Sequence, residues 1–296
     1  HQYDCAAMDQ QQNNHTEFQA LRAEIDRIDS ALLDLIKRRG EAVLRIGALK
    51  RAAGSSVADA LRPAREMEII RRLLEDYDGP LSADTLVGIW RSIIAAFLRL
   101  QYPFTVRVFA NGGGLDLWDL ARCHFGAGTP LATASDCRAV LRSIAAGEAV
   151  LGLLPDPEIL PWWVDLPLWG VNRPRVVAAL PVLETPGATS GYLVAASQPE
   201  PSGRDRCWIM VQGGERDGER IVAAAAAVEL ELSLVASYKA SGTTPTASHL
   251  LATSRCLSDD APELAALAAA AEANGIRGAA GVVGLFAEPL ARPDAR

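Results

Sequence analysis

The sequence is poor in the residues that build metal sites and disulfide frameworks. Its 296 residues contain five scattered cysteines, and no CxxC or Cys/His pair has the spacing of a zinc site. This pattern favours a reducing compartment and argues against a structural metal. The first eighteen residues contain no apolar core of a signal peptide, and no apolar run anywhere is long enough for a membrane span, so the cytoplasm is the expected location.

Positive charge is also scarce. The chain has 29 Lys and Arg against 36 Asp and Glu, which gives a formal net charge of −7. No basic stripe with interleaved aromatic residues occurs, so neither nucleic acid nor a membrane is expected as a partner. The length is sufficient for two or three domains.

The N-terminal segment carries little apolar periodicity. Residues 1–17 are polar and rich in Gln and Asn, a composition that buries too little apolar surface to order a chain. A disordered tail is therefore expected there. The chain does not begin with methionine, and whether residues 1–7, before Met8, are native stays open.

A long amphipathic helix is the first strong signal. Residues 21–51 contain an apolar stripe with steps of three and four, which predicts one unbroken helix. Two cations occupy positions on this stripe, Arg39 before Val43 and Lys50 after Ile46. Because a cation on a buried face is costly without an anionic partner, these two residues indicate a binding site for an anion.

Two shorter helices are predicted to follow. Pro63 suits the first position of a helix over residues 64–76, and Ser82 or Asp84 can cap a third helix that ends near residue 102. The two shorter helices are too few to cover the apolar face of a first helix about 45 Å long, so a helical dimer is expected. The predicted buried stripes are Glu66, Ile69/Ile70 and Leu73 in the second helix, and Leu86, Ile89/Trp90, Ile93, Phe97 and Leu100/Gln101 in the third.

Polar side chains on or beside the three stripes suggest one ligand. The set of cations, one carboxylate (Glu66) and one amide (Gln101) fits a small dianion with a neutral hydroxyl or ether. Arg39 and Lys50 lie about three turns, or roughly 16 Å, apart on one face, whereas Arg22 lies about 25 Å before Arg39. Arg22 could therefore reach the same ligand only from an antiparallel partner chain.

These residues form a pattern that resembles a known family. LRxEIDxID-x2-LLxLI-x2-R-x10-K, then RPxRE and W-x2-II-x6-Q, resemble the all-helical chorismate mutases over residues 18–103. The resemblance implies an intertwined homodimer that rearranges chorismate to prephenate in aromatic amino acid biosynthesis, without cofactor or metal. Phe97 departs from the pattern, because some members carry a small residue there. The implied roles are substrate-carboxylate binding by Arg39 and by the partner chain's Arg22, donation to the ether oxygen by Lys50 and Gln101, acceptance of the ring hydroxyl by Glu66, and additional positive charge from Arg65.

Beyond residue 104 the pattern changes to alternating strands and helices. The pieces VFANGGGLDLWDLA and AVLRSIAAGEAVLGLLPDPE resemble the first lobe of prephenate dehydratase, over residues 104–200. A second lobe is missing, and the family's Thr-Arg-Phe signature would fall at Ser190-Gly191-Tyr192, with glycine in place of arginine. A catalytically inactive lobe is therefore expected; an unrelated small α/β domain is the alternative.

The last part of the chain predicts a third fold. Residues 201–290 scan as βαββαβ, the order of a ferredoxin-like domain. The order resembles the ACT domain, which usually binds an amino acid, so an aromatic amino acid is a possible effector. The phenylalanine-binding motifs are not intact, since one of them would align near Ala236–Lys239.

Three functional hypotheses follow. The first is a monofunctional chorismate mutase with an inactive dehydratase-like lobe and an ACT-like domain. The second is a bifunctional chorismate mutase/prephenate dehydratase. The third is a non-catalytic, amino-acid-sensing regulator in which the mutase helices serve only for dimerisation.

Overall fold

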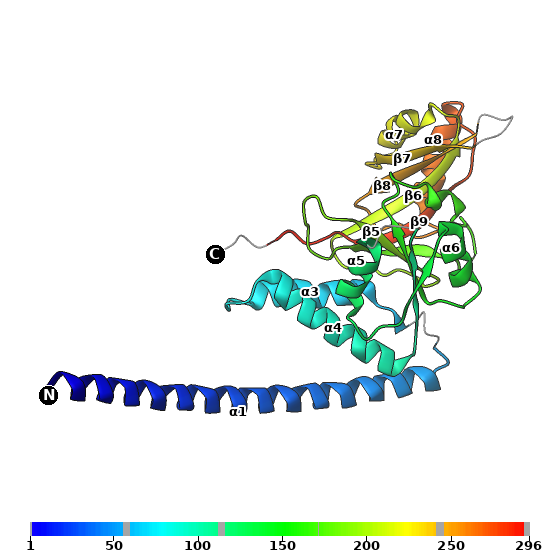
Figure 1. Ribbon diagram of the computed structural model, residues 1–296. Coiled ribbons are helices and arrows are strands. Elements are labelled where there is room, and N and C mark those ends of the chain that lie inside the picture. The colour runs from blue at the N-terminus through cyan, green and yellow to red at the C-terminus, as the bar shows by residue number, and fades with distance from the viewer. Residues whose placement is uncertain (1, 56–59, 112–115, 171, 241–245, 293–296) are drawn as a thin grey trace. The chain divides into compact units, whose positions relative to one another are not determined.

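The computed structural model describes the chain except residues 1, 56–59, 112–115, 171, 241–245 and 293–296 (Figure 1). Most of NGGG (111–114), in the stretch that resembles the dehydratase lobe, therefore lies outside the described residues. The chain divides into two compact units, residues 1–54 and 55–296, and each is treated by itself below. Among the described helices, none is both long and apolar enough to cross a membrane.

The first unit is the helix α1 (Gln2–Ala52). It contains the predicted helix over residues 21–51, which is confirmed, and it extends back to Gln2. The disordered tail expected over residues 1–17 is thus corrected for residues 2–17. The physical reason is that no proline or glycine interrupts the chain before Gly40, and Ala, Gln and Met propagate a helix at little cost.

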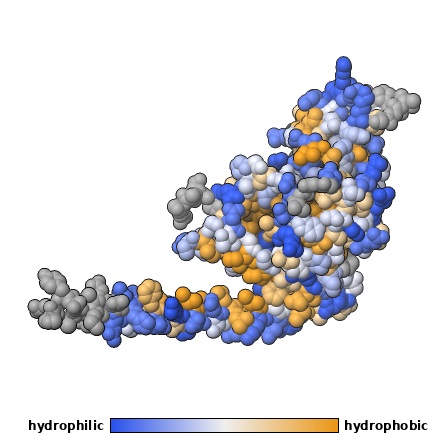
Figure 2. Space-filling view, viewed as in Figure 1, coloured by the Kyte–Doolittle hydropathy of each residue, from blue (hydrophilic) through white to orange (hydrophobic). Residues whose placement is uncertain are grey.

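One face of α1 is apolar and exposed. Figure 2 shows apolar residues repeating along the surface of this helix. Because an isolated helix gains no stability from an apolar face in water, α1 presents a surface that another helix can cover. The exposed large apolar residues of α1 are Phe18, Leu21, Ile25, Ile28, Leu32, Leu33, Leu35, Ile36, Leu44, Ile46 and Leu49.

In the second unit two helices precede the sheet, α3 (Pro63–Asp76) and α4 (Ala83–Gln101). Pro63 occupies the start of α3, as predicted. Ser82 caps α4, because its side chain accepts a hydrogen bond from the backbone N–H of Thr85. Both helices form where the sequence predicted them.

The faces that α3 and α4 bury differ from the predicted stripes. In α3 the buried residues are Ala64, Met67 and Ile70, so the face is turned by one position from Glu66. In α4 Leu86 is buried as expected, whereas Ile89 and Leu100 are exposed. α4 is apolar on two sides, and the side that packs against the core of this unit is not the one that the predicted stripe follows. The packed side consists of Val87, Arg91, Ile94, Ala95 and Leu98.

The described strands of the unit form one nine-stranded sheet, with the order β2-β1-β3-β5-β4-β9-β6-β8-β7. In its first half β1 pairs in parallel with β2 and β3, and β5 lies antiparallel between β3 and β4. The predicted sequence of strands and helices is confirmed. The elements are β1 (Val106–Phe109), α5 (Asp116–Phe125), β2 (Leu131–Ala134), α6 (Cys137–Ala145), β3 (Leu151–Pro155), the 3-10 turn η1 (Trp162–Asp165), β4 (Arg175–Leu180) and β5 (Gly191–Ala195).

The second half of the sheet has the order β9-β6-β8-β7 with antiparallel pairing throughout. Numbered within this half, the order is 4-1-3-2, so the predicted ferredoxin-like fold is confirmed. The two halves join where β4 pairs with β9 at Val176 and Gly284. The elements are β6 (Asp205–Gly213), α7 (Asp217–Ala226), β7 (Ser233–Lys239), β8 (Ala247–Thr253), α8 (Pro262–Ala273) and β9 (Ala280–Ala287).

The compact units divide after Gly54, so α3 and α4 belong to the same unit as the sheet. The reason is that α3 and α4 share a core with the strands: Met67, Ile70 and Ile94 belong to the same buried cluster as Val106 and Val177. These two helices therefore have apolar contacts to the sheet within a single chain.

Candidate active site

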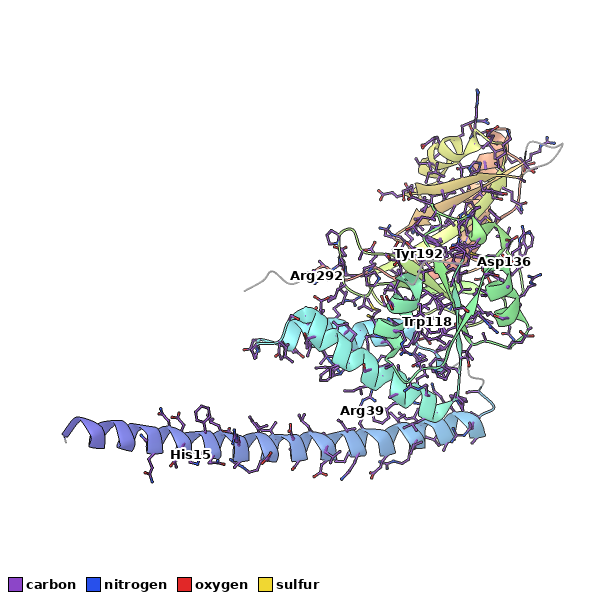
Figure 3. All side chains as sticks on the ribbon, in the orientation of Figure 1. His15, Arg39, Trp118, Asp136, Tyr192 and Arg292 are labelled. Atoms are coloured by element: carbon purple, nitrogen blue, oxygen red, sulfur yellow. The ribbon has the colours of Figure 1, made fainter. Side chains whose placement is uncertain are left out.

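Three of the candidate residues lie on α1. Arg22 is in its middle, and Arg39 and Lys50 are in its C-terminal part, where Figure 3 labels Arg39. Because α1 is continuous, Arg39 and Lys50 lie on one side of it, about three turns apart, as the sequence predicted. The helix thus fixes the spacing of two cations that could hold the ends of a small dianion.

Two more candidates begin α3. Arg65 forms an exposed ion pair with Glu68, 2.8 Å away, one turn further along the helix. Glu66 points elsewhere: its carboxylate forms an ion pair with Arg91 of α4, and only 17% of its side chain is exposed. Consecutive residues on a helix face directions about 100° apart, which separates the two neighbours.

Arg91 is the residue that the sequence analysis missed. Its side chain is 5% exposed, and each end of the guanidinium has a partner. Nη1 donates to Glu66 Oε2, Nε donates to the backbone oxygen of His124 at 3.2 Å, and Nη2 donates to His124 Nε2 at 2.5 Å. The sequence contains the same signal for Arg91 that identified Arg39, a cation on an otherwise apolar helix face. Arg91 lies on such a face between Val87 and Ile94.

The sixth candidate, Gln101, is the last residue of α4. Ten residues separate it from Arg91, which corresponds to about 15 Å along the helix. The cation that the structure brings to Glu66 is Arg91. The six candidates are distributed over both compact units, with Arg22, Arg39 and Lys50 in the first.

His124 has an unusual electrostatic environment. It lies near the end of α5, and burial together with the positive charge of Arg91 holds its pKa well below 6.5. The ring is therefore neutral, and Nε2 is free of a proton, so that it can accept the hydrogen bond from Arg91. The contact thus depends on one protonation state and one tautomer of the ring.

This environment predicts a pH dependence of stability. In the unfolded chain His124 takes up a proton below about pH 6.5, whereas in the folded chain it stays neutral, so the free energy of unfolding falls as the pH is lowered. The slope should reach about 1.4 kcal/mol per pH unit for this one group. Melting temperatures of the wild type and of His124→Gln between about pH 8 and pH 5 measure it. An equally steep acid dependence in the variant would contradict this assignment.

The segment at the start of β5, where the resemblance places the Thr-Arg-Phe signature of prephenate dehydratase, has a different sequence and structure from the one that signature implies. At the predicted signature position, Gly191 begins β5, and a Cβ added there would lie 2.9 Å from Leu117 Cδ2 and 3.0 Å from Leu153 Cδ1. Both atoms are the ends of leucine side chains, so an arginine at residue 191 would require Leu117 and Leu153 to shift. Nearby, Ser190 Oγ donates to Asp156 Oδ2 at 3.0 Å in a cleft that also contains Asn111.

Comparison with known proteins gives matches at the N-terminus. Residues 21–102 match the family model "Chorismate mutase type II", which confirms the resemblance predicted for the three helices. An intracellular chorismate mutase from Mycobacterium bovis is 42% identical over 59 residues, which are 20% of this chain and 53% of that protein.

Longer matches are found to bifunctional proteins. Two named "Bifunctional chorismate mutase/prephenate dehydratase" come from Aquifex aeolicus, 32% identical over 149 residues, and from Stutzerimonas stutzeri, 28% identical over 144 residues. Each match covers 47% of this chain, and the chain spans only 38% of the length of each relative. Among solved structures, prephenate dehydratase from Arthrobacter aurescens, in complex with L-Phe, has a TM-score of 0.45 at 14% identity, covering 64% of this chain and 93% of the other.

Proposed function

We propose that this chain is a chorismate mutase, which converts chorismate to prephenate in aromatic amino acid biosynthesis. The observation that carries the proposal is the family match over residues 21–102. Within that range the chain retains polar side chains at all six positions that the family pattern implies. They are Arg22, Arg39 and Lys50 on α1, Arg65 and Glu66 on α3, and Gln101 on α4.

The proposed chemistry suits these side chains. The rearrangement is intramolecular and breaks an ether bond while a carbon–carbon bond forms, so it needs no nucleophile. The planar guanidinium groups of Arg22 and Arg39 can each bind a carboxylate through two hydrogen bonds, which holds the substrate in its folded, reactive conformer. Lys50 and Gln101 can donate hydrogen bonds to the ether oxygen, where negative charge develops in the transition state. Glu66 would accept the hydrogen bond of the ring hydroxyl.

We also propose a homodimer with shared sites. The exposed apolar face of α1 is too extensive for a helix that stays single, and a second copy would cover it. Arg22 lies about 25 Å from Arg39 along α1, so only a partner's Arg22 could reach the ligand held at Arg39. For the ferredoxin-like half we propose an aromatic amino acid as the class of effector, because this half resembles the ACT domain.

A direct assay tests the function. We expect the full chain to convert added chorismate to prephenate, and prephenate to accumulate without phenylpyruvate, because Gly191 stands where the dehydratase signature has its arginine. Phenylpyruvate formation at neutral pH would instead support the bifunctional alternative, which the names of the relatives suggest. Acid treatment of the same samples, which converts prephenate to phenylpyruvate chemically, serves as the positive control. If chorismate is consumed no faster than in buffer, the mutase proposal fails and the regulator hypothesis takes its place.

A further inference from the structure

We propose that Arg91 and His124 are positioning residues that hold the Glu66 carboxylate in place, so that helix α5 of the α/β region supports the mutase site. The inference rests on the proposed function, since it assigns Glu66 to the substrate. It gives the α/β region a role that does not require any activity of its own.

The first step is the contact between Glu66 and Arg91. The two side chains form an ion pair with 17% and 5% exposure, so water competes weakly for either group. Glu66 Oε2 accepts from Arg91, and among the described residues no hydrogen bond to Glu66 Oε1 is found. A carboxylate has more acceptor positions than one donor uses, so Glu66 can accept a second hydrogen bond from a substrate hydroxyl.

The second step is that Arg91 itself is held fast. Its Nε and Nη2 donate to the backbone oxygen and to Nε2 of His124, at 3.2 and 2.5 Å. Moving the guanidinium would leave buried donors without acceptors, which is costly. Glu66 is thus fixed before any substrate arrives, and the conformational entropy of its side chain is lost on folding and not on binding.

The third step identifies where the support comes from. His124 is part of α5, which follows β1, and α5 packs against α4 in the same compact unit. Residue 124 lies beyond residues 21–102, which match the mutase family. The chain therefore fixes a carboxylate of the mutase segment through a residue of the following segment.

A purely structural role is the alternative, and the chain contains a matched control for it. Arg99 lies on the same helix α4 and also bridges to the end of α5, because its Nη1 donates to Thr129 Oγ1 and to the backbone oxygen of Phe125. It does not contact Glu66 among the described interactions. Removal of Arg99 therefore weakens the α4–α5 bridge without releasing the carboxylate.

The experiment compares single variants of the full chain. For Arg91→Gln and His124→Leu we expect kcat/KM for chorismate to fall by about tenfold or more, with a raised KM, because a charge-assisted hydrogen bond is lost or misplaced. His124→Gln keeps an acceptor for Arg91 and should recover most of the loss. Arg99→Gln should keep KM near the wild-type value even if its melting temperature falls. If Arg99→Gln and Arg91→Gln raise KM equally, the positioning role is wrong.

A double variant separates positioning from general damage. If Arg91 acts only through Glu66, then Arg91→Gln should have no further effect on kcat/KM in the background of Glu66→Gln. Independent, multiplying losses would overturn the inference. Failure of the proposed function has a different signature, since the wild type itself would then not consume chorismate faster than buffer.

Discussion

Replacing Arg39 with alanine should lower kcat/KM for chorismate by about a thousandfold, because a carboxylate of the substrate would lose its bidentate partner. Arginine matches a carboxylate with two parallel N–H donors, and no neighbouring side chain on α1 can substitute for that geometry. Part of the expected loss is in binding and part in the rate constant, since the arginine also holds the reactive conformer.

The matched control is Arg38→Ala. Arg38 is the preceding residue of the same helix, carries the same charge and is exposed, but faces about 100° away from Arg39. Steady-state rates of chorismate loss for both variants, with circular dichroism to verify helix content, complete the comparison. Equal activities of the two variants would remove Arg39 from the site and would favour the hypothesis of a dimerisation module without catalysis.

The fold was largely predictable from the sequence because periodicity reports secondary structure directly. The pattern of strands and helices after residue 104 predicted the described strands and α-helices but not the 3-10 turn η1, and the βαββαβ order agrees with the 4-1-3-2 sheet that β6–β9 form. The start of α1 was not predictable from the same signal. Residues 2–17 lack an apolar stripe, and their helix depends on propensity and on continuity with the stripe that follows.

The candidate site was predictable only in part, because helix patterns reveal a face but not its partner. α4 is apolar on two sides, so the sequence could not decide which side meets the sheet, and Arg91 was passed over although it interrupts one of them. The ion pair of Glu66 with Arg91 and the hydrogen bond between Arg91 and His124 are tertiary contacts between residues 25 and 33 positions apart in the chain. Such contacts leave no local pattern in the chain.

Mixed dimers provide the second test with a large expected effect. Arg22→Ala and Lys50→Ala proteins should each be nearly inactive as homodimers, because each variant damages both shared sites. A heterodimer of the two concentrates both substitutions in one site and leaves the other intact. Tandem purification through two different tags should therefore yield heterodimers with about half of the wild-type activity.

A second heterodimer serves as the control for the geometry of the shared sites. Arg39 and Lys50 lie on one side of α1, about 16 Å apart, and would serve one site within the same chain. A heterodimer of Arg39→Ala and Lys50→Ala thus carries one defect in each site and should remain inactive. Recovery in the Arg22 and Lys50 pair, without recovery in the Arg39 and Lys50 pair, is expected only if Arg22 crosses to the partner's site. Activity in neither purified heterodimer would show that the sites are not shared in this way, because one copy of α1 would then have to supply all three cations.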